Sequence, residues 1–177
     1  MEGLRSFRAV ADQRSSEDLA DFLAHALAME EDTAACYREL AKEMRQHGNI
    51  RVANLFSELA EFEAEDAAAI RARAKGMVLP RIPPWHGAAR PGATICDRPP
   101  HLVTEHDVLS LALEREQQAR HFFDSVAAGA ADPAIRDLAH ELALEEAGHI
   151  ARVHCALAQD STFPSTESER KDLHRSR

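Results

Sequence analysis

The feature that most constrains the fold is a helical pattern that occurs twice in the chain. The segment Val52-x-x-Leu-Phe-x-x-Leu-Ala-x-x-Glu63 has the same spacing as Ile135-x-x-Leu-Ala-x-x-Leu-Ala-x-x-Glu146. Upstream of each copy, an aromatic residue follows a glutamate after seven positions, as Tyr37 follows Glu30 in the first copy. Apolar residues that recur every three or four positions form one face of an amphipathic helix. The sequence therefore predicts a helical hairpin that has been duplicated.

Capping residues and glycines delimit four helical segments. The first is predicted to begin at Ser15 or Ser16, which are good N-caps, and the third at Thr104, where Asp107 completes a capping box. Asp132 followed by proline marks the start of the fourth. The predicted helices cover about residues 16–47, 49–75, 104–129 and 133–158.

The connections between these helices predict how the hairpins are joined. Both turns within the hairpins are short, so each hairpin should be antiparallel. The connection at residues 76–103 holds six of the eight prolines and is long enough to run the length of a bundle. Two antiparallel hairpins joined by a long crossover form a ferritin-like four-helix bundle of the all-α class. We expect this bundle over residues 16–158, after an N-terminal extension (1–15) and before a polar C-terminal tail (159–177).

Composition restricts the partners and the location. The formal net charge is −9 and no run of Lys or Arg is present, which disfavours a nucleic-acid partner. No segment reaches the apolar length of a membrane span, and the first residues lack the apolar core of a signal peptide. We therefore expect no membrane association and a cytoplasmic location. The three cysteines form no CxxC pair, which favours reduced thiols over a disulfide framework or an all-cysteine metal site.

Ionisable residues interrupt the apolar stripes of all four predicted helices. These inward positions are occupied by Glu30, Glu63, Asp66, Glu116, Glu146 and His149. Their separations from the turns place all of them near the middle of the bundle. A buried carboxylate without a partner is costly, and no Lys or Arg lies on these stripes to pair with it. A bound metal is the simplest counter-charge.

Simpler interpretations exist for each residue taken alone. A single glutamate on an alanine-rich helix is usually solvated surface, and an isolated histidine is usually a core or surface residue. The matched set favours metal binding instead. For Asp66 two interpretations stay open, a metal ligand or a polar relic of a decayed half-site. Tyr37 is interpreted as a core aromatic that hydrogen-bonds a ligand carboxylate rather than as a redox-active radical.

Four motifs resemble those of the rubrerythrin-like branch of the ferritin-like superfamily, over about residues 18–158. They are Glu30-x-x-Thr-x-x-Cys-Tyr37, Leu59-Ala-x-x-Glu63-x-x-Asp66, Glu116-x-x-Ala-x-x-Phe-Phe123 and Leu142-Ala-x-x-Glu146-x-x-His149. The resemblance implies two metal ions, iron first, with manganese or zinc as alternatives. It implies that Glu63 and Glu146 bridge the metals, while Glu30 and Glu116 are the single glutamates of their helices. His149 would be the terminal nitrogen ligand of one metal.

The chain departs from the family pattern at two positions. Asp66 stands where the family usually has a second histidine, and Ala119 stands where true rubrerythrins have a further glutamate. We also expect no rubredoxin domain. Replacing a neutral histidine by aspartate leaves the site with about one negative charge in excess, which predicts a lower reduction potential, a protonated carboxyl or asymmetric metal occupancy.

Two functions from different classes fit these features. The leading hypothesis is a di-iron oxidoreductase that reacts with dioxygen or peroxide, with ferroxidase-like or peroxidase-like chemistry. The alternative is a non-catalytic protein that stores or senses iron, manganese or zinc at a partly degenerate site. Whether the chain is an enzyme stays open at this point. We also expect a homodimer or a larger homo-oligomer.

Overall fold

The computed structural model describes the backbone of residues 2–82 and 104–160, and the side chains of residues 16–82 and 104–159. The described part is helical and contains no strand. Its elements are α1 (Glu2–Gln46), α2 (Ile50–Arg73), α4 (Glu105–Gly129) and α5 (Pro133–Asp160). The predicted all-α class is therefore confirmed. None of these helices combines the length and the apolar character that crossing a membrane would require.

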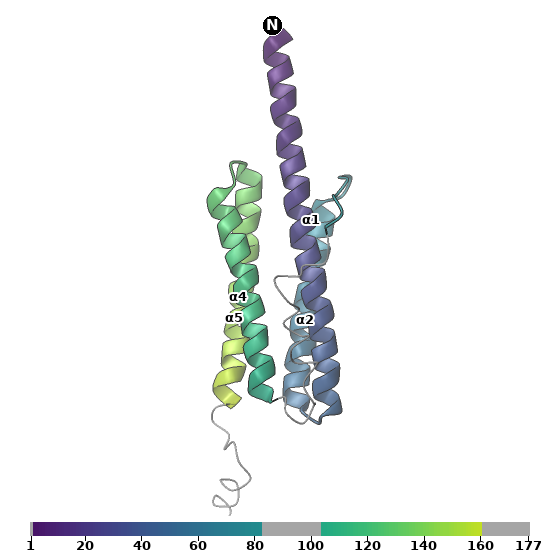
Figure 1. The fold of residues 1–177 in the computed structure, drawn as a ribbon, viewed down its shortest axis with the longest axis vertical. Helices are drawn as coiled ribbons and strands as arrows, with labels where there is room; N and C mark the ends of the chain where they lie inside the picture. The colour runs from purple at the N-terminus through teal and green to yellow at the C-terminus, as the bar shows by residue number, and fades with distance from the viewer. Residues whose placement is uncertain (1, 83–103, 161–177) are drawn as a thin grey trace, which may run out of the picture.

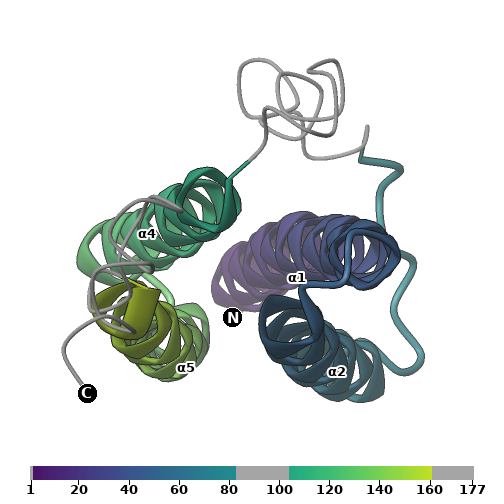
Figure 2. The same cartoon turned by 90° about the horizontal axis from the view of Figure 1, so that it is seen from below.

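The helices form two antiparallel hairpins that lie side by side. One hairpin is built from α1 and α2 and the other from α4 and α5, as Figure 2 shows in a view along the helices. Asn49 Nδ2 donates a hydrogen bond to Glu105 Oε2 at 2.9 Å, and Arg51 forms an ion pair with the same carboxylate. These contacts hold the start of α4 against the start of α2, so the two helices run parallel (Figure 1).

The end of α2 and the start of α4 lie at opposite ends of the bundle (Figure 1). This is the predicted ferritin-like arrangement, and it is confirmed. Of the predicted crossover at 76–103, residues 83–103 lie outside the described part of the chain, as does the predicted tail beyond Asp160.

Local sequence signals set most of the helix ends. Thr104 and Asp107 form the predicted capping box at the start of α4, each side chain accepting a hydrogen bond from the other residue's backbone N–H. At the start of α5, Asp132 Oδ1 accepts a hydrogen bond from the backbone N–H of Ala134 at 2.8 Å. Gly48 closes the first turn with φ +76°, a conformation that favours glycine.

The predicted start of the first helix was wrong. α1 begins at Glu2 and continues through Ser15 and Ser16 without a break. A serine caps a helix only where the chain leaves helical geometry, and no glycine or proline lies between Leu4 and His47 to force this. The first turns of α1 consequently extend beyond the ends of the other helices (Figure 1).

The apolar core of the described residues is divided into two clusters along the bundle. The first cluster includes Tyr37, Leu40, Val52, Phe56, Leu59, Leu109 and Val153. The second includes Leu23, Met29, Ile70, Phe123, Ile135, Leu138 and Leu142. On every helix, the buried ionisable residues fall between positions of the first cluster and positions of the second. The bundle therefore has a polar layer at mid-height with apolar packing on both sides.

Truncation of a side chain in one apolar cluster should reduce stability strongly. Leu59 is fully buried, so Leu59→Ala should lower the free energy of unfolding by about 2–5 kcal/mol through lost burial and the cavity left behind. Leu144 is 61% exposed and is a matched control, because Leu144→Ala should change stability by less than about 0.5 kcal/mol. Urea unfolding followed by circular dichroism measures both; equal losses would contradict the assignment of the core.

Candidate metal centre

Four of the inward ionisable residues meet in the polar layer. They are Glu63 from α2, Glu116 from α4, and Glu146 and His149 from α5, and one ligand atom of each lies within 4.8 Å of the others. All four side chains are buried, with exposed fractions of 1%, 1%, 3% and 6%. Glu146 and His149 are three positions apart on one helix and so point to the same side. We call this group the carboxylate–histidine cluster.

The imidazole of His149 faces the three carboxylates through one nitrogen. His149 Nδ1 lies 3.0 Å from Glu63 Oε1, 3.4 Å from Glu116 Oε2 and 3.7 Å from Glu146 Oε2. Within the described residues, none of these four buried atoms has a hydrogen-bond partner. Buried polar atoms are normally satisfied, so the convergence of these four is typical of a site that binds a cation. Anionic oxygens and an imidazole nitrogen are the donors that iron, manganese and zinc accept, and the cluster fits such a cation.

Glu30 adjoins this cluster from α1. Its side chain is 2% exposed. Burial raises the pKa of Glu30 well above its ordinary value, and the neighbouring Glu63 carboxylate raises it further. The structure thus brings carboxylates from both hairpins, and from all four helices, to the same level.

Asp66 lies at the edge of the polar layer. Its side chain is only half-buried, and it is outside the group of four whose ligand atoms converge. Burial raises the pKa of Asp66, whereas the nearby His149 lowers it. Of the six residues predicted for the site, four therefore converge, Glu30 adjoins them, and Asp66 is close but less enclosed.

Burial and mutual repulsion favour protonation of the carboxylates when no cation is present. Burial raises the pKa of Glu63 to about 7 and raises that of Glu146 well above its ordinary value. Burial alone would also raise the pKa of Glu116, but interactions with His149 and Tyr37 bring it below its ordinary value. Burial opposes the charge on His149, yet the surrounding carboxylates raise its pKa. Protons thus occupy the metal-free site, and binding of a cation must displace them.

Tyr37 makes the hydrogen bond that the sequence predicted. Its hydroxyl donates to Glu116 Oε1 and lies 3.4 Å from the carbonyl oxygen of Ala112. The ring is fully buried in the first apolar cluster. Since Tyr37 engages Oε1, the other oxygen of Glu116 is left to face His149.

Sequence reasoning missed two residues next to the cluster. The ring of Phe62 stacks on the His149 ring, with a centroid distance of 5.8 Å and an interplanar angle of 20°. The guanidinium of Arg152 lies over the same Phe62 ring, with Cζ 4.3 Å from the ring centroid. Their spacing from predicted ligands could have indicated them, because Phe62 directly precedes Glu63 and Arg152 follows His149 by three positions on the same helix.

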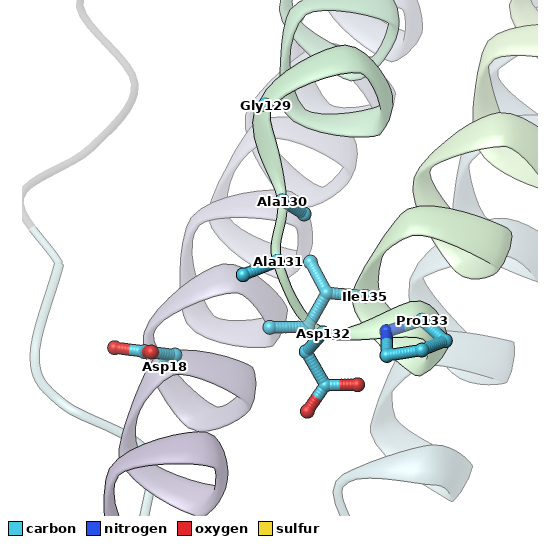
Figure 3. A pocket seen from close by; sticks show the side chains of 7 residues that line it. All are labelled: Asp18, Gly129, Ala130, Ala131, Asp132, Pro133 and Ile135. Carbon is cyan, nitrogen blue, oxygen red and sulfur yellow. The ribbon is translucent and has the colours of Figure 1, made fainter.

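A separate surface pocket lies at the α4–α5 turn (Figure 3). It has a volume of about 500 Å³, shares no residue with the carboxylate–histidine cluster, and is lined by Asp18, Gly129, Ala130, Ala131, Asp132, Pro133 and Ile135. Asp132 already accepts the backbone hydrogen bond that starts α5. This pocket therefore offers no comparable set of free ligand atoms.

The raised pKa values predict how the stability of the metal-free protein depends on pH. For Glu30, Glu63 and Glu146, the folded pKa lies above the ordinary value of 4.5, so the folded state binds more protons. That stabilising contribution is lost as pH rises through the folded pKa. His149 acts in the same direction above its ordinary pKa of 6.5, because its folded pKa is also raised.

In a metal chelator, the free energy of unfolding should therefore fall by more than about 1 kcal/mol between about pH 5 and about pH 8. Urea titrations at both pH values measure the change. Glu146→Gln should reduce the pH dependence because it removes one of the titrating groups, whereas the exposed Glu61→Gln should leave it unchanged. A stability that rises over this range would contradict the electrostatic description of the site.

Comparison with known proteins agrees with this architecture. The family model described as Rubrerythrin matches residues 21–154. The crystal structure of an uncharacterized conserved protein from Magnetospirillum magnetotacticum MS-1 is similar, with a TM-score of 0.72 and 29% sequence identity over 83% of this chain and 97% of that chain. Comparison with curated proteins gives no match. Since the family model covers most of the chain, with α2, α4 and parts of α1 and α5, the chain belongs to the rubrerythrin family.

Proposed function

We propose that this chain is a di-metal carboxylate protein, with iron as the first candidate metal, which reacts with dioxygen or peroxide. The observation that carries the proposal is the convergence of three buried carboxylate oxygens and His149 Nδ1, none of which has a hydrogen bond within the described residues. Membership of the rubrerythrin family supports the same chemistry. A purely structural bundle would have no reason to bury these unsatisfied groups together.

The residues that would hold the metals come from all four helices. They are Glu30, Glu63, Asp66, Glu116, Glu146 and His149. When bound, two iron ions would supply the electrons for reduction of the oxidant. The protein supplies hard anionic ligands in a layer enclosed by the two apolar clusters, which limit access of water from either end.

Tyr37 and the carboxylates control protons at this layer. The Tyr37 hydroxyl holds the proton that it shares with Glu116 Oε1, and so orients that carboxylate. Burial raises the pKa of Tyr37, which favours its neutral, donating form. Burial raises the pKa of Glu63 to about 7 in the absence of a cation, so near neutral pH this carboxyl releases its proton when a metal binds.

The two metal positions should be unequal. In the duplicated hairpins Asp66 occupies the place that His149 occupies in the second copy. The histidine side is buried within the cluster, whereas Asp66 is half-buried and outside it. We propose that the position near Asp66 binds its metal more weakly. This asymmetry also favours the second candidate function, a non-catalytic metal-binding protein for storage or sensing.

Metal stoichiometry tests the site itself. Anaerobic loading with ferrous iron, followed by desalting, should leave about two irons per chain in the wild type, as two-metal carboxylate bundles hold. Glu116→Gln should lose at least about one of them, because it removes a charged ligand at the centre of the cluster. Glu114→Gln alters an exposed glutamate on the same helix and should bind as the wild type does. Full retention of iron by Glu116→Gln would contradict the assignment.

Oxygen consumption separates the two candidate functions. After anaerobic ferrous loading, addition of oxygenated buffer should give oxygen uptake that scales with the bound iron, measured with an oxygen electrode. The zinc-loaded protein is the control, since zinc does not change its oxidation state. Iron that stays bound and ferrous in the presence of oxygen, and also after addition of hydrogen peroxide, would exclude the oxidoreductase and favour storage or sensing.

A further inference from the structure

His149 lies at the inner end of a stack that reaches the surface of the bundle. Its ring lies nearly parallel to the Phe62 ring, in an offset stack with a centroid distance of 5.8 Å and an interplanar angle of 20°. Arg152 covers the Phe62 ring at 4.3 Å, and its Nη1 donates to Glu58 Oε1 at 2.9 Å. The four side chains alternate between α2 and α5, from an exposed ion pair to the buried imidazole.

This stack addresses a requirement of any histidine that binds a metal. The imidazole torsion is broad, so rotation of the ring would turn Nδ1 away from the carboxylates. Metal-binding histidines usually prevent this with a hydrogen bond from the second ring nitrogen. Within the described residues, His149 Nε2 makes no such hydrogen bond. The offset stacking on Phe62 therefore restricts ring rotation here, together with the contacts of Nδ1 to the carboxylates.

The outer layers of the stack hold Phe62 in place. The planar guanidinium of Arg152 is attracted to the ring face, and its pairing with Glu58 restricts where it can lie. Arg152 also places a positive charge on the histidine side of a site that has about one negative charge in excess. Both effects favour one orientation of the imidazole and binding of a metal beside it.

The duplicated hairpin lacks an equivalent stack. The repeat that aligns Glu63 with Glu146 aligns Phe62 with Glu145 and Asp66 with His149. An aromatic ring therefore stands behind the histidine, while a carboxylate occupies the corresponding position behind Asp66. The stack belongs to one metal position and not to the bundle in general.

We propose that Phe62 and Arg152 are positioning residues that orient His149 toward the carboxylates and so create a tight metal position on the histidine side. This inference rests on the proposed metal-binding function. It assigns Phe62 and Arg152 a role in the affinity and the coordination of one metal.

The test is a titration of the metal-free full-length protein with Co²⁺, followed by its visible absorption bands, which report the ligands and geometry of the ion. Phe62→Leu keeps apolar bulk but removes the flat ring, and should weaken the tighter Co²⁺ site by about tenfold and change its band pattern, as loss of an orienting contact does at other metal sites. Phe62→Tyr keeps the stack and should retain the wild-type affinity and spectrum.

Two further variants separate positioning from general damage to the fold. Phe122→Leu removes a half-buried ring that stacks on Phe22 and meets Phe123 edge-on beside the second apolar cluster, and should lower stability without changing Co²⁺ binding. Arg152→Gln changes a residue at the surface, so it should fold, and it should weaken the same Co²⁺ site by a few-fold.

The results for these variants distinguish the positioning role from the proposed metal site. Wild-type affinity and spectrum in both Phe62→Leu and Arg152→Gln would overturn the positioning role and leave the proposed metal site intact. A Phe122→Leu variant that loses Co²⁺ affinity as Phe62→Leu does would also overturn it, because the effect would then be one of stability. Failure of the wild type to bind Co²⁺ would overturn the proposed function, and this inference with it.

Discussion

The stability of the structure depends on what offsets the cost of burying five ionisable side chains at the middle of the bundle. Glu30, Glu63, Glu116, Glu146 and His149 are each no more than 6% exposed. Removing unpaired carboxylates from water costs several kcal/mol per group, which is comparable with the whole stability of a domain of this size. Protons bound to the carboxylates reduce this cost in the metal-free protein. A divalent cation would reduce it further, because several carboxylate oxygens can bind one cation.

This requirement relates the fold to the function. Two antiparallel hairpins bring one carboxylate from each helix to the same level, and the apolar clusters on both sides keep that level enclosed. Contacts between the hairpins fix the register, including the pairing of Glu105 with Asn49 and Arg51 at one end. A small relative shift of the hairpins would separate Glu63 from His149, and the buried charges would then lose the interactions that offset their burial.

Much of this arrangement could be predicted from the sequence, because helical periodicity determines which face a residue occupies. The positions of Glu63, Glu116, Glu146 and His149 between apolar neighbours predicted both their burial and their common level. The start of α1 could not be predicted in this way, since Ser15 and Ser16 are compatible with a helix interior as well as with a cap. The Phe62–His149–Arg152 stack depends on side-chain rotamers and on long side chains that cross between α2 and α5, which spacing along one helix does not specify.

The most direct test of the central claim is the anomalous diffraction of crystals soaked anaerobically in ferrous iron, with data collected on both sides of the iron absorption edge. We predict a strong anomalous peak among Glu63, Glu116, Glu146 and His149, within ligand distance of His149 Nδ1, and a weaker second peak toward Asp66. Crystals with no anomalous density in the polar layer, or with iron only at exposed carboxylates, would contradict it.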